Sequence, residues 1–408
     1  MSSATPMNKT PTEEKKYSPV FLAVFAVFLI VTAICVAGTI VGVLEARLAH
    51  HDTQWFWAAG RLLAHGQNPY DRQAIRAIET ELGLPLKSSV PMTLNPPYSL
   101  WLMVPIGLLG PRAAAAAWSL LLAAFFVVSV LVLRGMVNGP YERGYMLLAW
   151  FFAPALCCIE VGQTGLITLL GLVLFLRLER NQPFWAGVAL SLCAVKPHLI
   201  LPFGVVLIVW IAARRKWTVV AGAISALAVE SVIAMLFDHA IWRHYRALMS
   251  TERFVDEFIP TFGVALRFAV DRTAMWLEFV PAAVGSVWGL WYFWRHRETW
   301  DWRVGGILVV LVSLVAAPYA WFTDQVIALP AIVFALTWPG GPRKGSVTLL
   351  LLLMSLAGVD MMITKDLFTK ADMLLGVAWL VWYLYAVSGT GAFAAVRAGY
   401  SGDSARHP

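Results

Sequence analysis

Long apolar runs separated by short polar junctions occupy most of the chain. The first run, Val20 to Leu44, is longer than a signal-peptide core and lacks a small-residue cleavage site followed by a soluble chain. A helix needs roughly 20 residues to cross a bilayer, so we expect a retained span here and about twelve crossings in all. Several are short, as broken or tilted helices packed against neighbours can be. The later crossings are predicted at 113–133, 145–160, 164–179, 184–197, 199–213, 217–237, 274–294, 304–320, 323–338, 346–363 and 371–388.

One apolar run, residues 97–110, is bracketed by prolines and is too short to cross, so we expect a re-entrant or half-crossing segment. The basic junctions then share the side of the N-terminal lysines, which the positive-inside tendency places in the cytoplasm. A full crossing would put Arg214-Arg215-Lys216 outside, and we reject it. The junctions on the inner side are Arg134/Arg143, Arg177/Arg180, Arg214-Arg215-Lys216, Arg295/Arg297/Arg303, Arg343-Lys344, Arg397 and Arg406.

The segment from Leu48 to Leu82 follows the first span and is too polar for hydrocarbon. Its apolar residues recur at helical spacing and predict a helix over 53–65 that lies flat on the bilayer, with Gln54, Arg61 and His65 on the polar side. Gly66 can end this helix, and Asp71 can cap a second one. The apolar positions are Trp55, Phe56, Ala59, Leu62 and Leu63 in the first helix, and Ile75, Ile78 and Leu82 in the second.

A second outer loop, 238–273, also has amphipathic spacing. Ile241, Tyr245 and Leu248 mark one helix, and Phe262 and Leu266 mark another; we expect both at the membrane interface.

Composition narrows the class of protein. Hydrophobic residues make up 59% of the 408 positions and charged residues 13%, against about 25% charged in soluble domains. The net charge is +7, but the basic residues are scattered along the chain, and this pattern does not favour a nucleic-acid-binding surface. The four cysteines lie in apolar runs and form neither a disulfide framework nor a metal motif. We expect an all-α polytopic membrane protein, with a disordered cytoplasmic tail at 1–18, one transmembrane domain at 19–388 with outer loops 45–96 and 238–273, and a second cytoplasmic tail at 389–408.

Asp52 is the first candidate for chemistry, because it follows the first span where the chain surfaces. It can cap the helix that follows, where the helix dipole favours an anion. It can also act as a general base that takes a proton from an attacking hydroxyl. The two roles are compatible. His51 beside it is either a second polar group or a plain surface histidine.

Lys196-Pro197-His198 lies between two apolar stretches and separates them. A lysine at the end of a span commonly reaches for water. Two donors at a broken helix near the lipid boundary also suit a lipid-borne phosphate, whose leaving-group charge a lysine stabilises.

Two further turns belong to the same outer face. In the turn 160–165, Gln163 can donate and accept hydrogen bonds, although the glycines fit a plain helical hairpin equally well. In the hairpin 317–325, Asp324 is a binding residue or a helix cap, and Tyr319 and Trp321 form a sugar platform or part of an aromatic belt. Glu160, Glu230 and Asp360 have no neighbours that define a role.

The sequence lacks the motifs of nucleotide-binding proteins, zinc sites and serine hydrolases. The chain lacks a P-loop, a GxGxxG after a strand, zinc-type spacing and a GxSxG elbow. We therefore expect no metal and no cofactor. The outer side of the membrane lacks nucleotide sugars, so a sugar donor there would be lipid-borne.

Five motifs in order resemble those of bacterial glycosyltransferase family 87, in the GT-C superfamily of polyprenyl-phosphate-sugar-dependent membrane transferases. They are HDTQWFWAAGRLLAHGQNPYD, LNPPYSLWLMVPIGLLG, VGQTGLITLLGLVL, WAGVALSLCAVKPHLILPF and APYAWFTDQVIALP, which together cover roughly residues 45 to 335.

The resemblance implies an inverting transfer, often of mannose, at the outer face of the bacterial plasma membrane. The donor would be a polyprenyl-phosphate sugar and the acceptor a glycolipid or glycan hydroxyl. Carried over, Asp52 is the base, and Lys196 and His198 contact the phosphate. The mycobacterial mannosyltransferases of the family have a histidine in the later hairpin, where this chain has Thr323 and Asp324.

We therefore expect a GT-C-type transferase in which Arg61, Asp71, Gln163, Tyr319, Trp321 and Asp324 are candidates for binding sugar or acceptor. A transporter or lipid flippase is the alternative, and it would place paired polar groups near the bilayer midplane. A non-catalytic assembly partner with the same fold is a third possibility. The enzyme hypothesis requires Asp52 and Lys196 to share one pocket.

Overall fold

A computed structural model describes residues 17–45, 52–83, 93–137, 142–251, 255, 257–338, 341–363 and 372–388, and over these residues the protein is all-helical. His51, residues 1–16 of the predicted first tail and the whole of the second lie outside the described residues.

Six helical stretches are long and apolar enough to cross a membrane, which makes this a polytopic membrane protein. They are α1 (Pro19–Glu45), α6 (Pro111–Arg134), the stretch Gly144–Val161, the stretch Pro197–Arg214, α12 (Trp217–Phe237) and α18 (Ser346–Ile363). Shorter apolar helices add α9 (Gly165–Leu178), α10 (Pro183–Cys193), Trp302–Ala316, Phe322–Thr337 and α19 (Asp372–Val387).

Prolines mark where many helices begin. A proline in the first turn costs no hydrogen bond, because the first N–H groups of a helix have no partner within it. Pro154 begins α8 (Ala153–Val161) in this way, so the span predicted at 145–160 is two helices, α7 (Glu142–Ala149) and α8. Pro281 likewise lies in the first turn of α15 (Val280–His296). The α-helical part of the span predicted at 274–294 therefore begins there, after a 3₁₀ turn, η3 (Met275–Phe279).

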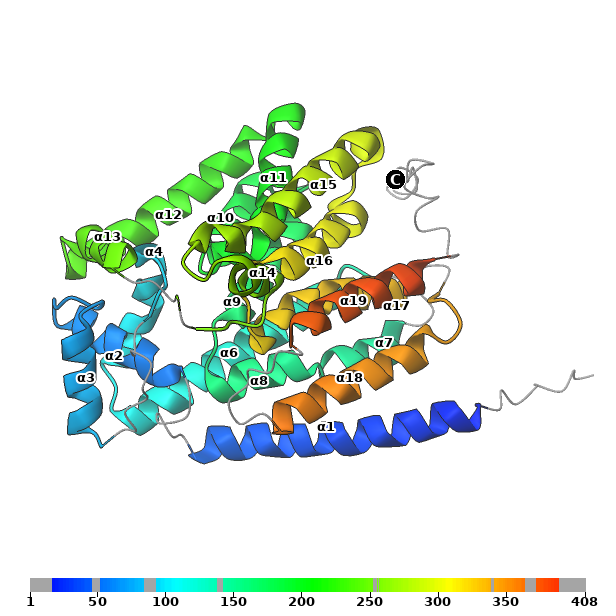
Figure 1. Cartoon of the computed structure of the whole chain (residues 1–408), viewed down its shortest axis with the longest axis horizontal. Helices are drawn as coiled ribbons and strands as arrows, with labels where there is room; N and C mark the ends of the chain where they lie inside the picture. The colour runs from blue at the N-terminus through cyan, green and yellow to red at the C-terminus, as the bar shows by residue number, and fades with distance from the viewer. Residues whose placement is uncertain are drawn as a thin grey trace, which may run out of the picture.

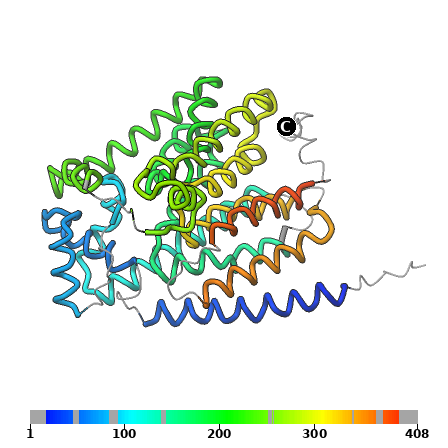
Figure 2. Tube along the Cα trace, viewed as in Figure 1, coloured from blue at the N-terminus to red at the C-terminus, as the bar shows by residue number. Residues whose placement is uncertain are grey.

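The long helices α1, α18 and α19 run in roughly the same direction, α12 is tilted against them and α3 (Arg72–Glu81) runs across them, with α1 at the edge of the molecule beside α18 (Figures 1 and 2). The predicted outer segments gather at the end where α1 and α12 finish (Figure 1). These segments are α2 (Thr53–Ala64), α3, α4 (Pro97–Leu100) and α13 (Ile241–Thr251); α14 (Phe262–Val270) follows α13 along the chain.

Residues 97–107 form three short helical pieces, α4, η1 (Trp101–Met103) and α5 (Val104–Gly107), instead of a span. Two glycines let this segment pack on α2. A Cβ on Gly60 would lie 2.1 Å from the Met103 carbonyl oxygen, and one on Gly107 would lie 2.2 Å from the Gly60 carbonyl carbon. Trp57 Nε1 also donates to the Leu109 carbonyl at 3.0 Å.

The helix predicted at 53–65 is present as α2, but its surroundings differ from the prediction. Its apolar face is buried under α5, η1 and α6 and does not meet lipid. Gln54, expected on the polar side, is 1% exposed. The helical spacing was correct; the partner of the apolar face depended on the chain folding back at 97–107.

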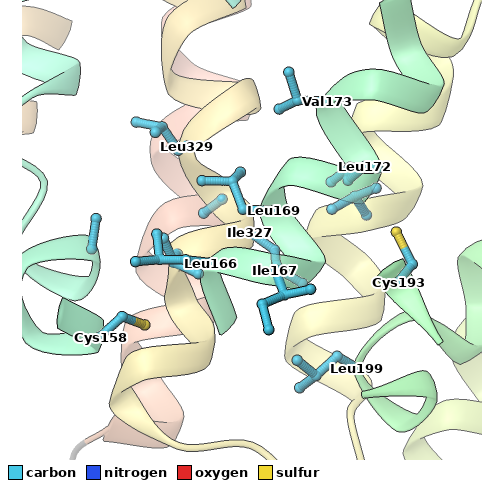
Figure 3. Packing of buried hydrophobic residues seen from close by; sticks show 14 of the residues in the cluster. Cys158, Leu166, Ile167, Leu169, Leu172, Val173, Cys193, Leu199, Ile327 and Leu329 are labelled. Carbon is cyan, nitrogen blue, oxygen red and sulfur yellow. The ribbon is translucent and has the colours of Figure 1, made fainter. Parts of the chain in front are cut away.

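The core is centred on α9, which is buried along most of its length. Figure 3 shows Leu166 and Leu169 of α9 facing Ile327 and Leu329, which follow the later hairpin, with Cys193 and Leu199 on the other side. This packing brings the turn before α9, the break after α10 and the hairpin at 317–325 to the same core.

Candidate functional site

Asp52 is held by the turn between α8 and α9. Its backbone N–H donates to the Val161 carbonyl at 3.2 Å, and Thr53 Oγ1 contacts the same oxygen at 3.5 Å. The predicted cap is wrong: the Asp52 side chain makes no capping bond to α2, and its backbone is helical (φ −82°, ψ −15°) instead of extended. The carboxylate is therefore directed to a different partner.

Gly162 makes this turn possible. Its φ of +79° lies in the left-handed region that favours glycine. A Cβ there would lie 1.9 Å from Thr53 Oγ1, so α2 approaches the turn closely. Trp118 Nε1 donates to the Gly162 carbonyl at 2.8 Å and fixes the turn against α6. No sequence pattern singled out Trp118, which lies inside the apolar helix α6.

Gln163 connects the two charged ends of the site. Its Nε2 donates to Asp52 Oδ2, and its Oε1 accepts from Lys196 Nζ at 2.8 Å. A glutamine does this because its amide carries both donors and an acceptor. Asp52 and Lys196, predicted to share one pocket, are thus joined through one side chain.

Lys196 is also paired with a buried carboxylate. Its Nζ lies 2.6 Å from Asp324 Oδ1, and the two side chains are 8% and 0% exposed. Asp324 Oδ2 accepts from the Trp321 backbone N–H at 3.0 Å, so this residue both caps the turn η6 (Phe322–Ala328) and binds Lys196. The cluster holds two carboxylates and one ammonium, and a buried ion pair needs such supporting hydrogen bonds.

Aromatic rings adjoin the cluster. His198 meets Tyr319 edge to face with ring centres 5.2 Å apart, and Tyr319 meets Trp321 at 5.5 Å. His198 Nε2 is buried and has no hydrogen-bond partner among the described residues, which leaves it available to a ligand oxygen.

The outer loop reaches the same hairpin. Thr261 Oγ1 donates to the Pro318 carbonyl at 3.2 Å, and Ile259, Val264 and Trp321 form a small buried cluster. Both helices predicted in this loop are present, as α13 and α14. The loop therefore covers one side of the residues that follow α16 (Ile307–Ala316).

Two predicted binding residues lie elsewhere. Arg61 is exposed on α2 over the Trp57 ring, and Asp71 caps α3 by accepting from Gln73 and Ala74 at 2.9 and 3.1 Å. Of the carboxylates without a defined role, Glu230 accepts from Ser191 at 2.7 Å. Glu160 lies against Gly42 of α1.

A comparison with known protein families matches residues 94–358 to glycosyltransferase family 87. The chain belongs to this family. Comparison with curated proteins and with solved structures gives no match. Membership confirms the resemblance found in the sequence and implies that the protein transfers a sugar.

The matched range of the family 87 chain contains Gln163, Lys196, His198 and Asp324. It begins after Asp52, so the assignment of that residue rests on its contacts with Val161 and Gln163. In this arrangement the Asp52 carboxylate can accept a proton, and the Lys196 ammonium, connected to it through the Gln163 amide, can neutralise an anion.

Proposed function

We propose that this protein transfers a hexose, with inversion, from a polyprenyl-phosphate sugar to a hydroxyl of a glycolipid or glycan at the outer face of the bacterial plasma membrane. The fold would be a GT-C-type bundle with about twelve crossings, as the apolar runs indicate. The observation that carries the proposal is the connected series Asp52, Gln163, Lys196 and Asp324.

In the proposed step, Asp52 takes the proton of the acceptor hydroxyl. The acceptor oxygen then attacks the anomeric carbon, and the bond from that carbon to the phosphate oxygen breaks. The electron pair leaves with the polyprenyl phosphate. Gln163 holds the Asp52 carboxylate, so the base is oriented before substrate binds.

Lys196 and His198 are proposed to bind the leaving phosphate. Two of the three N–H groups of Lys196 donate to Gln163 and Asp324, and the third remains for a phosphate oxygen. His198 Nε2 offers a second polar contact. Asp324 holds the ammonium in place, and the charges of the two groups balance each other.

Tyr319 and Trp321 are proposed to form the wall on which the sugar packs. Their perpendicular rings, close to His198, suit the flat face of a pyranose. Mannose is the first sugar to test, because the family resemblance implies it. Asp324, at the place where the mannosyltransferases have a histidine, is engaged with Lys196, so other hexoses belong in the same assay.

The deciding experiment uses the full chain reconstituted in lipid nanodiscs with radiolabelled polyprenyl-phosphate mannose, glucose or galactose and a membrane lipid acceptor. Asp52→Asn keeps an oxygen for Gln163 but removes the base. We expect transfer to fall by at least about 100-fold with unchanged melting temperature and donor binding.

Asp271→Asn is the matched control, since Asp271 is an exposed carboxylate of the outer loop that bonds only Thr273 among the described residues. It should transfer at the wild-type rate. Full activity of Asp52→Asn would remove Asp52 as the base. Uptake of labelled substrate into vesicles without transfer would support a transporter instead.

A further inference from the structure

The break before Pro197 leaves carbonyl groups at the end of α10 without helical partners. In a continuous helix the carbonyls of Ala194 and Val195 would accept from N–H groups four residues later. Here the chain turns into η2 (Pro197–Ile200) instead. These two carbonyls immediately precede Lys196, so whatever binds them sets the position of the Lys196 backbone.

Residues just before and at the start of the re-entrant segment supply the missing donors. Tyr98 Oη donates to the Ala194 carbonyl at 2.9 Å, and Asn95 Nδ2 donates to the Val195 carbonyl at 3.4 Å. Thr93 Oγ1 donates to Asn95 Oδ1 at 2.7 Å, which orients the amide so that its nitrogen faces Val195. Side chains about 100 residues away in sequence thus cap α10 at its functional end.

A second layer supports the first. Tyr70, which is 4% exposed, donates its hydroxyl to the Asn95 carbonyl at 2.8 Å. Burial raises the pKa of Tyr70, so the hydroxyl keeps the proton it donates. The turn before α3, the re-entrant segment and the α10 break are therefore linked by consecutive hydrogen bonds.

We propose that Asn95 and Tyr98 are positioning residues for Lys196, with Tyr70 supporting them from behind. This inference rests on the proposed function, because it acts through the lysine that meets the donor phosphate. Lys196 Nζ must reach Gln163 Oε1 and Asp324 Oδ1 together, at 2.8 and 2.6 Å. Such a site tolerates displacements of only about 0.5 Å.

The hydroxyl groups can be removed without removing the rings. Tyr98 packs on Trp242 with ring centres 6.1 Å apart, and Tyr70 packs on Tyr245 at 5.4 Å. A phenylalanine at either position keeps this aromatic cluster. The variants therefore separate hydrogen bonding to the α10 end from packing of the outer elements.

The test measures affinity for a fluorescent polyprenyl-phosphate sugar in nanodiscs, with melting temperature followed alongside. Tyr98→Phe should weaken donor binding by about tenfold, the value of one buried hydrogen bond. Tyr70→Phe, one layer further out, should weaken it by about threefold. Tyr245→Phe is the control; it removes a hydroxyl from the same cluster and should bind donor as the wild type does.

A double-mutant cycle distinguishes positioning from plain stability. In the background Lys196→Met/Asp324→Asn, which removes the ion pair without leaving a lone charge, Tyr98→Phe should lower donor affinity by less than about twofold. A tenfold loss that persists in this background, or wild-type affinity of Tyr98→Phe itself, would overturn the inference. Failure of the wild-type protein to bind any polyprenyl-phosphate sugar would instead reject the proposed function.

Discussion

At the scale of single residues, Gln163 decides how the site is built. Its amide reconciles two groups that would otherwise need separate partners, the Asp52 carboxylate and the Lys196 ammonium. The series of side-chain contacts continues from Lys196 to Asp324, whose carboxylate also accepts from the Trp321 backbone N–H. The buried charges of Lys196 and Asp324 balance each other, and the half-buried Asp52 carboxylate accepts a hydrogen bond from the Gln163 amide.

The buried pair yields a stability prediction. Lys196→Met leaves the fully buried Asp324 without its counter-charge and should destabilise the protein by about 3–5 kcal/mol. Adding Asp324→Asn should recover much of that loss, because the lone charge is removed. Unfolding in detergent, followed by tryptophan fluorescence, measures both.

The exposed pair Arg297–Glu298 is the control, with side chains 49% and 81% exposed and 3.2 Å between Nε and Oε1. Glu298→Gln should change stability by at most about 1 kcal/mol, since solvent screens such pairs. Equal stability of Lys196→Met and wild type would show that the pair contributes nothing to the fold.

Residue-level reasoning from sequence had uneven success here. Asp52, Gln163, Lys196 and Asp324 were selected from their positions at helix ends, and the structure brings all four together. Asp71, which was also selected at a helix end, caps α3, and Arg61, selected on the polar side of the first outer helix, is exposed over the Trp57 ring. A polar residue at a helix end can cap, pair or bind, and only its neighbours decide which.

At the scale of elements, close approach between segments places the site. The turn at Gly162 meets α2 where Thr53 occupies the space that a side chain would need. The same crowding recurs between α2 and α5 at Gly60 and Gly107. The glycines therefore determine how closely α2 packs on α5 and on the turn between α8 and α9, and hence where Asp52 lies.

Gly162→Ala tests this crowding. The new methyl group would overlap Thr53 Oγ1 in addition to the strain of φ +79°. We expect a loss of stability above about 2 kcal/mol and strongly reduced transfer, because α2 must shift. Melting temperature and transfer rate are the two measurements.

Gly66→Ala provides the comparison. Gly66 has a similar φ of +70°, but a Cβ there would approach no atom closer than 3.5 Å. It should lose only the strain energy of about 1 kcal/mol and keep its activity. If the two variants behaved alike, crowding at Gly162 would not matter.

At the scale of the whole molecule, the arrangement of charge predicts which side faces out. The predicted outer segments gather at one end of the bundle, and the positive-inside tendency places the opposite end in the cytoplasm (Figure 1). The four natural cysteines are buried and free in the structure, so a cysteine introduced at the surface can be labelled selectively.

Arg76→Cys on α3 should react with a membrane-impermeant thiol reagent in intact cells. Glu298→Cys, at an 81% exposed side chain in a basic junction, should react only after permeabilisation. Both expected labelling results follow from the predicted topology, in which residues 97–107 fold back and do not cross the membrane. The reverse labelling pattern would invert the proposed orientation and move the donor site to the cytoplasmic side.

The sequence by itself determined most of the helices, because hydrophobic periodicity, proline and glycine act over a few neighbouring residues, although the spans predicted at 145–160 and 274–294 are each interrupted. It also determined the family. Only the tertiary structure decided that Gln163 meets Asp52 across 111 residues of sequence and that Lys196 meets Asp324 across 128. These contacts depend on which faces of α2, α9 and α10 pack together, and that choice is made by the shape of the whole core rather than by any local pattern.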